Sequence, residues 1–275
     1  MDVQELLERY HRGETNFEKV DLHGQILGNI NLSRINLKEA DLSDVNLVDC
    51  SLSEANFKET NLTNAIIRGD LTAVNLIQAN LHKANLAKSN LSDSSLRNAN
   101  LSDSDFSYAI LNCSLLHDTN LKKANLSHAT MINCLLSRAN LTEANLQGAN
   151  LQGANLTNAI MMNTNLEGAN LSLTQMNGVN GVGIYAAHAN FSHANLSGGN
   201  FVKGDFNNAN FYDSMMTWGS FKMTNFSHAN LSEAKLLWSN FTRANLQKAN
   251  LVNTNISQTN FDLANLEDII MTIDN

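Results

Sequence analysis

The chain of 275 residues contains no proline, has only three cysteines, and is only 16% charged. The absence of proline, with an ordinary hydrophobic content of 43%, excludes a Pro-rich disordered tract and a collagen-like repeat, so a folded chain is expected. Cys50, Cys113 and Cys134 are too few and too scattered for a disulfide framework or a zinc site, which needs four closely spaced ligands. We therefore expect free thiols in a reducing compartment.

Long apolar runs are also missing. No stretch of eighteen apolar residues is present that could cross a bilayer, and the N-terminal sequence MDVQELLERYHRG lacks the apolar segment of a secretory signal. The sequence therefore predicts a soluble, cytoplasmic protein that binds no membrane.

What is present is a repeat of five residues, plainest in ANLQGANLQGANL over residues 144–156. A large apolar residue marks the centre of nearly every pentad, from Phe17 to Ile67 and, after a slip of one residue at IIRGDL, from Leu71 to Met271; the weakest centres are Gly181 and Ala186. All eleven phenylalanines lie on these centres. A small residue stands two positions before each centre, usually with asparagine between them. In an extended segment the centre and the small residue share one face, and the asparagine points the other way.

Corners are predicted at the second residue after each centre, where glycine and asparagine gather, because these types accept positive φ. Phe201, Phe221, Phe241 and Phe261 are twenty residues apart, which indicates four pentads per coil. Like side chains would then stack along the coils about 4.8 Å apart. The pattern predicts an all-β solenoid with apolar residues inside and asparagine ladders outside.

The pattern resembles the pentapeptide-repeat family, whose motif is A(N/D)LXX. The resemblance covers nearly everything from Phe17 to Met271. It implies a right-handed quadrilateral parallel β-helix, here of about 13 coils. We expect residues 1–14 to form a capping helix and turn and residues 15–275 a single solenoid, with a register slip near 67–71 and an irregular coil near 177–188.

The two ends of this solenoid differ. Residues 2–11 carry apolar residues at helical spacing, which predicts a short helix that covers the first coil. The C-terminal sequence LEDIIMTIDN has no comparable helix. Either its apolar residues fold over the last coil, or a second chain covers them, which would give end-to-end association or a homodimer. These residues are Ile269, Ile270, Met271 and Ile273.

No catalytic, metal or cofactor site is predicted. Serine, histidine and aspartate occupy variable outward positions one at a time, without a buried partner to orient them. His188 and His228 share a column, but at two coils apart they are too distant to share a metal ion. We interpret the corner histidines as solvated, and the chain as no enzyme.

The net charge of −8 raises a DNA-mimic hypothesis, because the resemblance implies that some relatives imitate DNA and bind type II topoisomerase such as DNA gyrase. Residues 1–70 hold thirteen acidic and seven basic residues, however, so the charge lies at one end. Its corner acids form a belt around the coils, whereas a duplex mimic needs charge along a face. These acids are Glu39, Asp44, Asp49, Glu54 and Glu59. We keep this reading as the alternative and expect no direct binding of nucleic acid.

One surface is apolar. Trp218 and Trp238, the only tryptophans, lie twenty residues apart at outward corners and are expected to stack. The outward residues nearby are Tyr212, Met215, Met223 and Leu237. They predict a docking surface, although two tryptophans that only cover each other would give the same pattern. The N-terminal helix followed by RGETNF also resembles family members from filamentous cyanobacteria that regulate heterocyst differentiation, which implies a protein partner of unknown identity. The sequence thus favours a non-enzymatic binding or scaffold protein, with a pure spacer still open.

Overall fold

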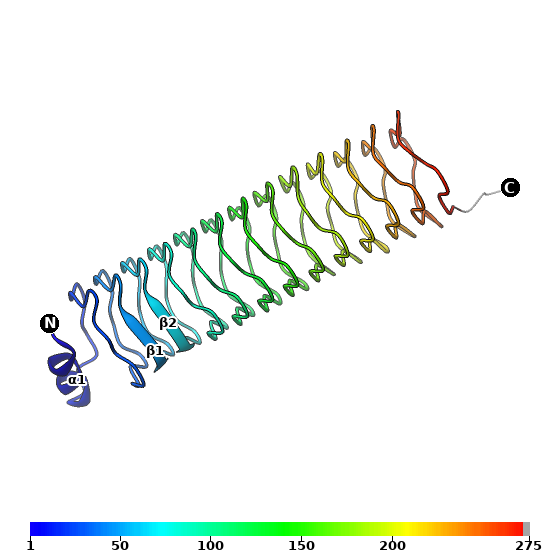
Figure 1. The fold of residues 1–275 in the computed structure, drawn as a ribbon. Coiled ribbons are helices and arrows are strands. Elements are labelled where there is room, and N and C mark those ends of the chain that lie inside the picture. The colour runs from blue at the N-terminus through cyan, green and yellow to red at the C-terminus, as the bar shows by residue number, and fades with distance from the viewer. Residues whose placement is uncertain (272–275) are drawn as a thin grey trace. The chain divides into compact units, whose positions relative to one another are not determined.

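The computed structural model describes residues 1–271, which fall into two compact units, Met1–Leu135 and Leu136 onward. In each unit, short extended segments alternate with two-residue turns along coil after coil (Figure 1). The longer regular elements are helix α1 (Val3–His11) and strands β1 (Asn46–Ser51) and β2 (Ile66–Asp70). The prediction of a strand-built chain with a short N-terminal helix is therefore confirmed. The expectation of one solenoid over residues 15–275 stays a prediction.

The coils in each unit pair in parallel at a spacing of twenty residues, or of nineteen across the register slip in the first unit. Asn80 pairs with Asn100 in the first unit, and Asn200 with Ser220 in the second. The Phe201 N–H donates forward to the Ser220 carbonyl at 2.8 Å, while the Ser220 N–H donates back to the Gly199 carbonyl at 2.9 Å. Twenty residues contain four pentads, so each coil has four extended segments and four turns. This is the period that the phenylalanine spacing predicted.

Each turn places one residue in the left-handed region. Non-glycine residues at the second position after the centre have φ between 49° and 64°, among them Glu39, Trp218 and Trp238. This conformation costs a residue with a side chain about 1–2 kcal/mol. Backbone hydrogen bonds on both sides of each turn offset this cost. The predicted corners thus form with almost any residue type.

The interior consists of the centres and the small residues before them. Every centre from Phe17 to Leu251 is buried. Phe201, Phe221 and Phe241 form a stack with ring centroids 5.4 Å and 4.9 Å apart. Serine, threonine or cysteine can replace the small alanine where the side chain donates to a backbone carbonyl, either of the preceding coil, as from Thr164 to Leu141 at 2.8 Å, or three residues back, as from Ser104 to Leu101 at 2.6 Å.

Helix α1 covers the first coil. Asp2 caps it by accepting from the Glu5 N–H at 2.7 Å, and Leu6 is fully buried. The Tyr10 hydroxyl donates to the Ser33 carbonyl at 2.8 Å, and the Arg9 guanidinium lies 5.3 Å from the Phe17 ring centroid. The centres of the first coil are buried as deeply as those further along, so the predicted cap is formed.

The register slip is taken up at one turn. In the parallel pair of β1 and β2, Val48 lies opposite Arg68, but Cys50 lies opposite Gly69, so Asp49 has no counterpart. Gly69 has φ of +140°, and a Cβ there would lie 2.3 Å from the Cys50 carbonyl oxygen. Only glycine permits the shortened turn. Pairing continues on both sides of it.

Residues 177–188 differ from the expected irregularity. Their backbone follows the same pattern of bridges and turns as the coils beside them. The ring of Phe201 fills the space above Gly181, since a Cβ on Gly181 would lie 2.8 Å from the Phe201 Cδ1 atom. The weak centre is thus compensated by a side chain of the next coil rather than by a change in backbone.

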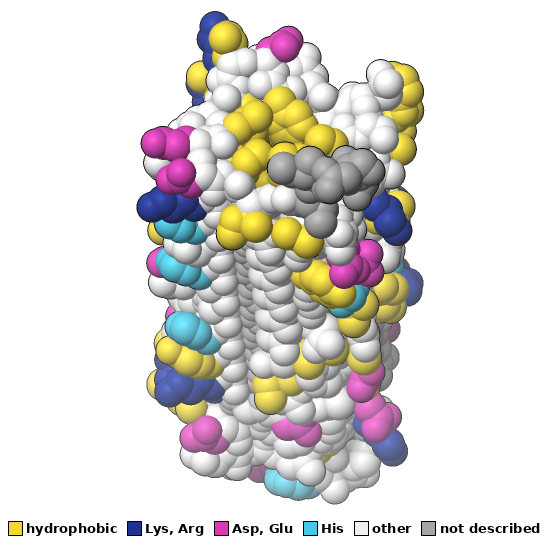
Figure 2. All heavy atoms as spheres, turned by 90° about the vertical axis from the view of Figure 1, so that its right-hand side faces the viewer, with side chains coloured by type: hydrophobic (Ala, Val, Ile, Leu, Met, Phe, Trp, Pro, Cys, Tyr) yellow, Lys and Arg dark blue, Asp and Glu magenta, His cyan; other side chains and the backbone are white. Residues whose placement is uncertain are grey.

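The C-terminal coil has no cover among the described residues. Its centres Ile256, Leu266 and Met271 are 36%, 40% and 42% exposed, whereas Leu251, one coil earlier, is 3% exposed. Ile270 is 58% exposed, and Ile269 is half-buried. Ile273 lies outside the described residues. Figure 2 looks onto this end, where hydrophobic side chains gather in the upper part of the view.

Candidate functional site

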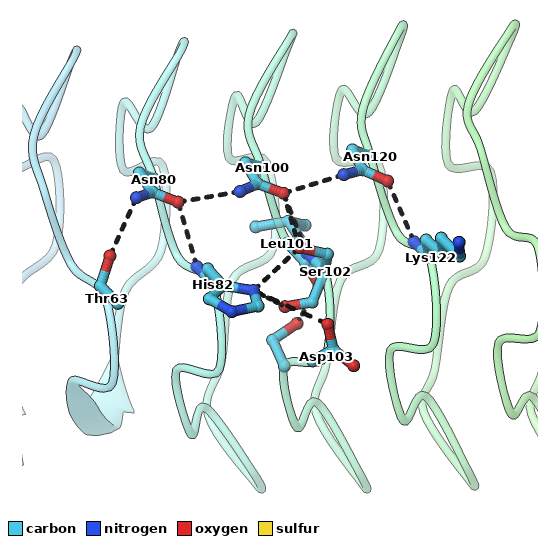
Figure 3. A network of polar contacts seen from close by, with 10 residues as sticks. Thr63, Asn80, His82, Asn100, Leu101, Ser102, Asp103, Asn120 and Lys122 are labelled. Carbon is cyan, nitrogen blue, oxygen red and sulfur yellow. Dashed lines mark hydrogen bonds and ion pairs between the residues drawn. The ribbon is translucent and has the colours of Figure 1, made fainter.

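Histidine, serine and aspartate side chains come together at His82, Ser102 and Asp103 (Figure 3), and in the same arrangement at His23, Ser43 and Asp44. The His82 Nδ1 atom lies 3.0 Å from the Ser102 Oγ atom and 3.7 Å from the Asp103 carboxylate. A catalytic triad needs the serine and the carboxylate on opposite ring nitrogens of the histidine, but here both face Nδ1. The Ser102 hydroxyl in turn donates to Asn100 at 2.9 Å. These contacts join neighbouring coils and assemble no nucleophile.

Most outward polar groups are used by the fold in the same way. Asn100 donates to Asn80 at 3.0 Å, and Asn120 donates to Asn100 at 2.9 Å, which forms an amide ladder across three coils (Figure 3). The same oxygens also accept the backbone N–H two residues further on, as from Lys122 to Asn120 at 3.2 Å. The predicted ladders are present, and they leave few polar groups for a ligand.

Metal and membrane sites have no counterpart in residues 1–271. No group of three or more histidine, cysteine, aspartate or glutamate side chains is placed to hold a metal ion within this range. No helix in the same range has the length and hydrophobicity needed to cross a membrane.

The three cysteines are free, and two of them are buried. Cys134 is buried and donates to the Leu111 carbonyl at 2.7 Å, and burial raises the pKa of its thiol to about 12. Burial also raises the pKa of Cys50, whereas Cys113 is exposed. Thiols with a raised pKa are poor nucleophiles, so Cys50 and Cys134 act as small interior residues.

The two tryptophans stack at the surface of the second unit. Their ring centroids lie 5.3 Å apart with planes 6° from parallel, and Trp218 and Trp238 are 66% and 51% exposed. Each sits at a turn with positive φ, and the Trp218 N–H donates to the Leu237 carbonyl at 3.0 Å. Leu237 is half-buried, and Met215, three residues before Trp218, is 40% exposed. We call these four residues the tryptophan surface.

The other two predicted residues lie at the neighbouring turns. Met223 is 50% exposed and follows the next extended segment after Trp218. Tyr212 precedes the segment that holds Met215 and lies among polar groups, because its hydroxyl donates to Glu233 at 3.2 Å. The Glu233 charge raises the pKa of Tyr212. All six residues predicted from the sequence are therefore exposed or half-buried. Four of them form the tryptophan surface, and two flank it.

The turn position that holds Trp218 and Trp238 is occupied by Gly178 and Gly198 in the two preceding coils, and the surroundings of these two glycines differ. The side chain of Asn158 lies over Gly178, where its Oδ1 atom would be 2.4 Å from an added Cβ, whereas nothing lies within 4 Å of that position at Gly198. The surface beside the tryptophans is thus partly covered by a side chain. Only Gly198, next to Trp218, is open.

The acidic corners are largely paired with cations. Glu39 lies 3.4 Å from Lys19 and 2.8 Å from Lys38, and Glu54 lies 3.0 Å from Arg34. A hydrogen bond from Lys38 lowers the pKa of Glu39, and one from Arg34 lowers that of Glu54. The acids of this belt were predicted from the sequence, but their cationic partners were not. The signal was available, since Lys19 and Arg34 stand twenty residues before Glu39 and Glu54.

Comparison with known proteins gives one family and several solved structures. The family model for pentapeptide repeats matches eight times, over residues 15–53, 30–69, 70–103, 99–138, 139–178, 189–227, 217–247 and 239–272. Curated protein sequences gave no match.

Three solved structures illustrate the likeness. HetL, a pentapeptide repeat protein involved in heterocyst differentiation regulation from the cyanobacterium Nostoc sp. strain PCC 7120, is 24% identical, with 98% of this chain and 97% of that chain covered and a TM-score of 0.27. Rfr23 from the cyanobacterium Cyanothece 51142 is 27% identical, with 44% and 92% covered and a TM-score of 0.34. QnrB1, a plasmid-mediated fluoroquinolone resistance protein, is 13% identical, with 94% and 93% covered and a TM-score of 0.24.

TM-scores of this size mean that the structures do not superpose closely, so the assignment rests on the family model. That model matches well over half of the chain, and its repeats coincide with the pentads whose centres are buried. The chain belongs to the pentapeptide-repeat family.

Proposed function

We propose that the chain is a non-enzymatic protein-binding scaffold, built as a right-handed, four-sided parallel β-helix of about 13 coils. Its contact site is the tryptophan surface. The observation that carries this proposal is the pair of stacked tryptophans, 66% and 51% exposed, with Met215 40% exposed beside them. Rigid aromatic side chains lose little conformational entropy on binding and dominate many protein interfaces.

The position of the tryptophans supports this reading. Both lie on turns and outside the core, so the fold does not need their bulk: other turns in the same place hold lysine, aspartate or asparagine. A cytoplasmic location is part of the proposal, in keeping with three free cysteines.

The test is the double substitution Trp218→Ser/Trp238→Ser. We expect the circular dichroism spectrum and melting temperature to stay close to the wild type, and association with the native partner to weaken by at least about 2 kcal/mol. The partner is obtained by affinity capture from the source cell and its binding measured by calorimetry. Tyr108→Ser is the matched control, because Tyr108 is 55% exposed and also stacks on a neighbouring ring, that of His128. A double variant that unfolds, or one that binds every partner as before, would reduce the tryptophans to a clasp between coils.

A second proposal concerns the open C-terminal coil. Its exposed centres and unpaired edge fit a second copy of the chain, because α1 already covers the other end. This homodimer would leave the tryptophan surface free for its partner.

The DNA-mimic alternative is disfavoured. Of the five corner acids in residues 1–70, Glu39 is engaged by Lys19 and Lys38 and Glu54 by Arg34, so the belt presents no continuous row of free charge. We expect the chain to leave DNA supercoiling by gyrase unchanged. Inhibition at low micromolar protein that disappears as salt is raised would restore this alternative.

A further inference from the structure

The tryptophan surface lies within a strip of exclusively positive charge. The strip consists of three nine-residue stretches that stack on one another, residues 195–203, 215–223 and 235–243. It contains four basic residues and no acidic residue. The basic residues are Lys203, Lys222, Lys235 and Arg243, and all four are exposed.

This clustering contrasts with the rest of the unit. Residues 136–271 contain six basic and eight acidic residues, so the strip holds four of the six and none of the eight. The two stretches stacked before it, residues 155–163 and 175–183, carry no charge. An acidic protein therefore has a local positive field around its tryptophans.

The cations of the strip are unused by the fold. Within residues 1–271, none of the four forms an ion pair, although the acids at its border do have partners. Asp213 lies 3.1 Å from His193, and Glu233 accepts from Tyr212. Four exposed cations without counter-charges repel one another at short range, and an anionic partner would relieve that repulsion.

Register places these cations on the segments and turns next to those of the tryptophans. Lys235 pairs with Met215 across adjacent coils, and Lys222 follows Trp218 by four residues, over one extended segment. The Lys203 N–H donates to the Lys222 carbonyl at 3.0 Å, which places Lys203 in the preceding coil next to Lys222. Arg243 stands two coils beyond Lys203, roughly 10 Å away along the stack.

From this charge complementarity we infer that the tryptophan surface binds an acidic segment of a protein, with apolar side chains on the tryptophans and carboxylates on the four cations. The inference rests on the proposed function and specifies the chemistry of its partner. Roughly 10 Å corresponds to three residues of a peptide in the polyproline II conformation, where side chains three residues apart lie on the same face, so the segment carries carboxylates three residues apart with apolar residues between them.

A single-stranded nucleic acid is the other polymer that combines anionic groups with flat rings. Its affinity depends on many phosphate contacts and falls steeply with salt. Four cations on a chain of net charge −8 supply few such contacts. The apolar side chains of Met215, Met223 and Leu237 fit aliphatic and aromatic side chains better than a phosphate backbone.

The probe is the end-blocked peptide Glu-Leu-Phe-Glu-Leu-Phe-Glu, labelled with fluorescein. Anisotropy gives its affinity for the full-length chain. An unlabelled copy is titrated while tryptophan emission is followed, which locates binding because Trp218 and Trp238 are the only tryptophans. We expect saturable binding, a shift in emission, and about tenfold weaker binding of Lys222→Glu/Lys235→Glu. Lys83→Glu/Lys88→Glu makes the same change in net charge in the first unit and should bind like the wild type.

The outcomes separate the two proposals. No saturable binding of the acidic peptide, equal binding of its lysine analogue, or unchanged affinity of Lys222→Glu/Lys235→Glu would overturn the charge inference. Displacement of the peptide by an oligo-deoxythymidine of eight nucleotides at lower concentration would overturn it in favour of nucleic acid. None of these outcomes affects the test of the proposed function, which is whether binding of the native partner requires Trp218 and Trp238.

Discussion

A single residue absorbs the irregularity of the repeat. At Gly69 the backbone has φ of +140°, and the space for a Cβ is taken by the Cys50 carbonyl oxygen at 2.3 Å. We expect Gly69→Ala to destabilise the chain by about 2–4 kcal/mol, because both backbone strain and a clash with main-chain atoms oppose it. Gly168→Ala is the control.

Gly168 has φ of +63° and nothing within 4 Å of an added Cβ, so its substitution should cost only about 1 kcal/mol. Urea unfolding of both variants measures the difference. Equal costs would mean that the shortened turn has room to relax.

Individual residues also show which features of the fold could be predicted from the sequence. The burial of every centre from Phe17 to Leu251 follows from the pentad itself, because side chains alternate between the two faces of an extended segment. The pairing of Glu39 with Lys19 could have been found by counting twenty residues. The position of the Phe201 ring above Gly181 could not have been found from the sequence. A repeat pattern does not specify side-chain rotamers, and these decide which neighbour fills a gap.

The candidate site, like the core, could be predicted only in part from the sequence. The stacking and exposure of Trp218 and Trp238 followed from a spacing of one coil. The positive strip around them went unnoticed because its cations are scattered along the sequence and meet only when stretches twenty residues apart are aligned. The position of Asn158 over Gly178 depends on a side-chain conformation, so only the structure reveals it.

At the scale of elements, ion pairs between successive turns link the first coils. Because Glu39 and Glu54 have lower pKa values folded than unfolded, their contribution is complete above the unfolded pKa and is lost as pH falls through the folded pKa. We expect the urea midpoint of the wild type to decline between about pH 6 and about pH 3 more than that of Glu39→Gln/Glu54→Gln.

The effect should be modest and reduced by salt, because these side chains are exposed. Asp49→Asn is the control, since Asp49 belongs to the same belt and forms no ion pair within residues 1–271. A decline that is equally steep in all three proteins would show that other carboxylates govern it.

At the scale of the whole molecule, the two ends of the chain differ in cover. If the open last coil pairs with a second copy, the wild type should sediment as a dimer. Ile270→Glu should shift it toward monomer, because Ile270 is 58% exposed and points outward from the last bridged segment. Leu263→Glu, at an exposed turn of the same coil, should remain dimeric. Since α1 covers the first coil, that coil offers no second open edge, and the contact closes after two copies and gives no fibres.

If the wild-type protein sediments as a monomer at every concentration, the open coil has no role in self-association. Dissociation of the Leu263→Glu control along with Ile270→Glu would point to added charge, and not to contact at the bridged segment, as the cause.

The pairing of coils at twenty residues sets a rule for changes in length. Within residues 136–271, removing twenty residues such as 156–175 takes out one coil and leaves every later side chain in its column, so Trp218 and Trp238 keep their cationic neighbours. Removing five residues instead moves all later residues by one side relative to the coils before them. A lineage can thus lengthen or shorten this chain in whole coils while its binding surface is inherited intact. A gain or loss of one pentad relocates that surface in a single step.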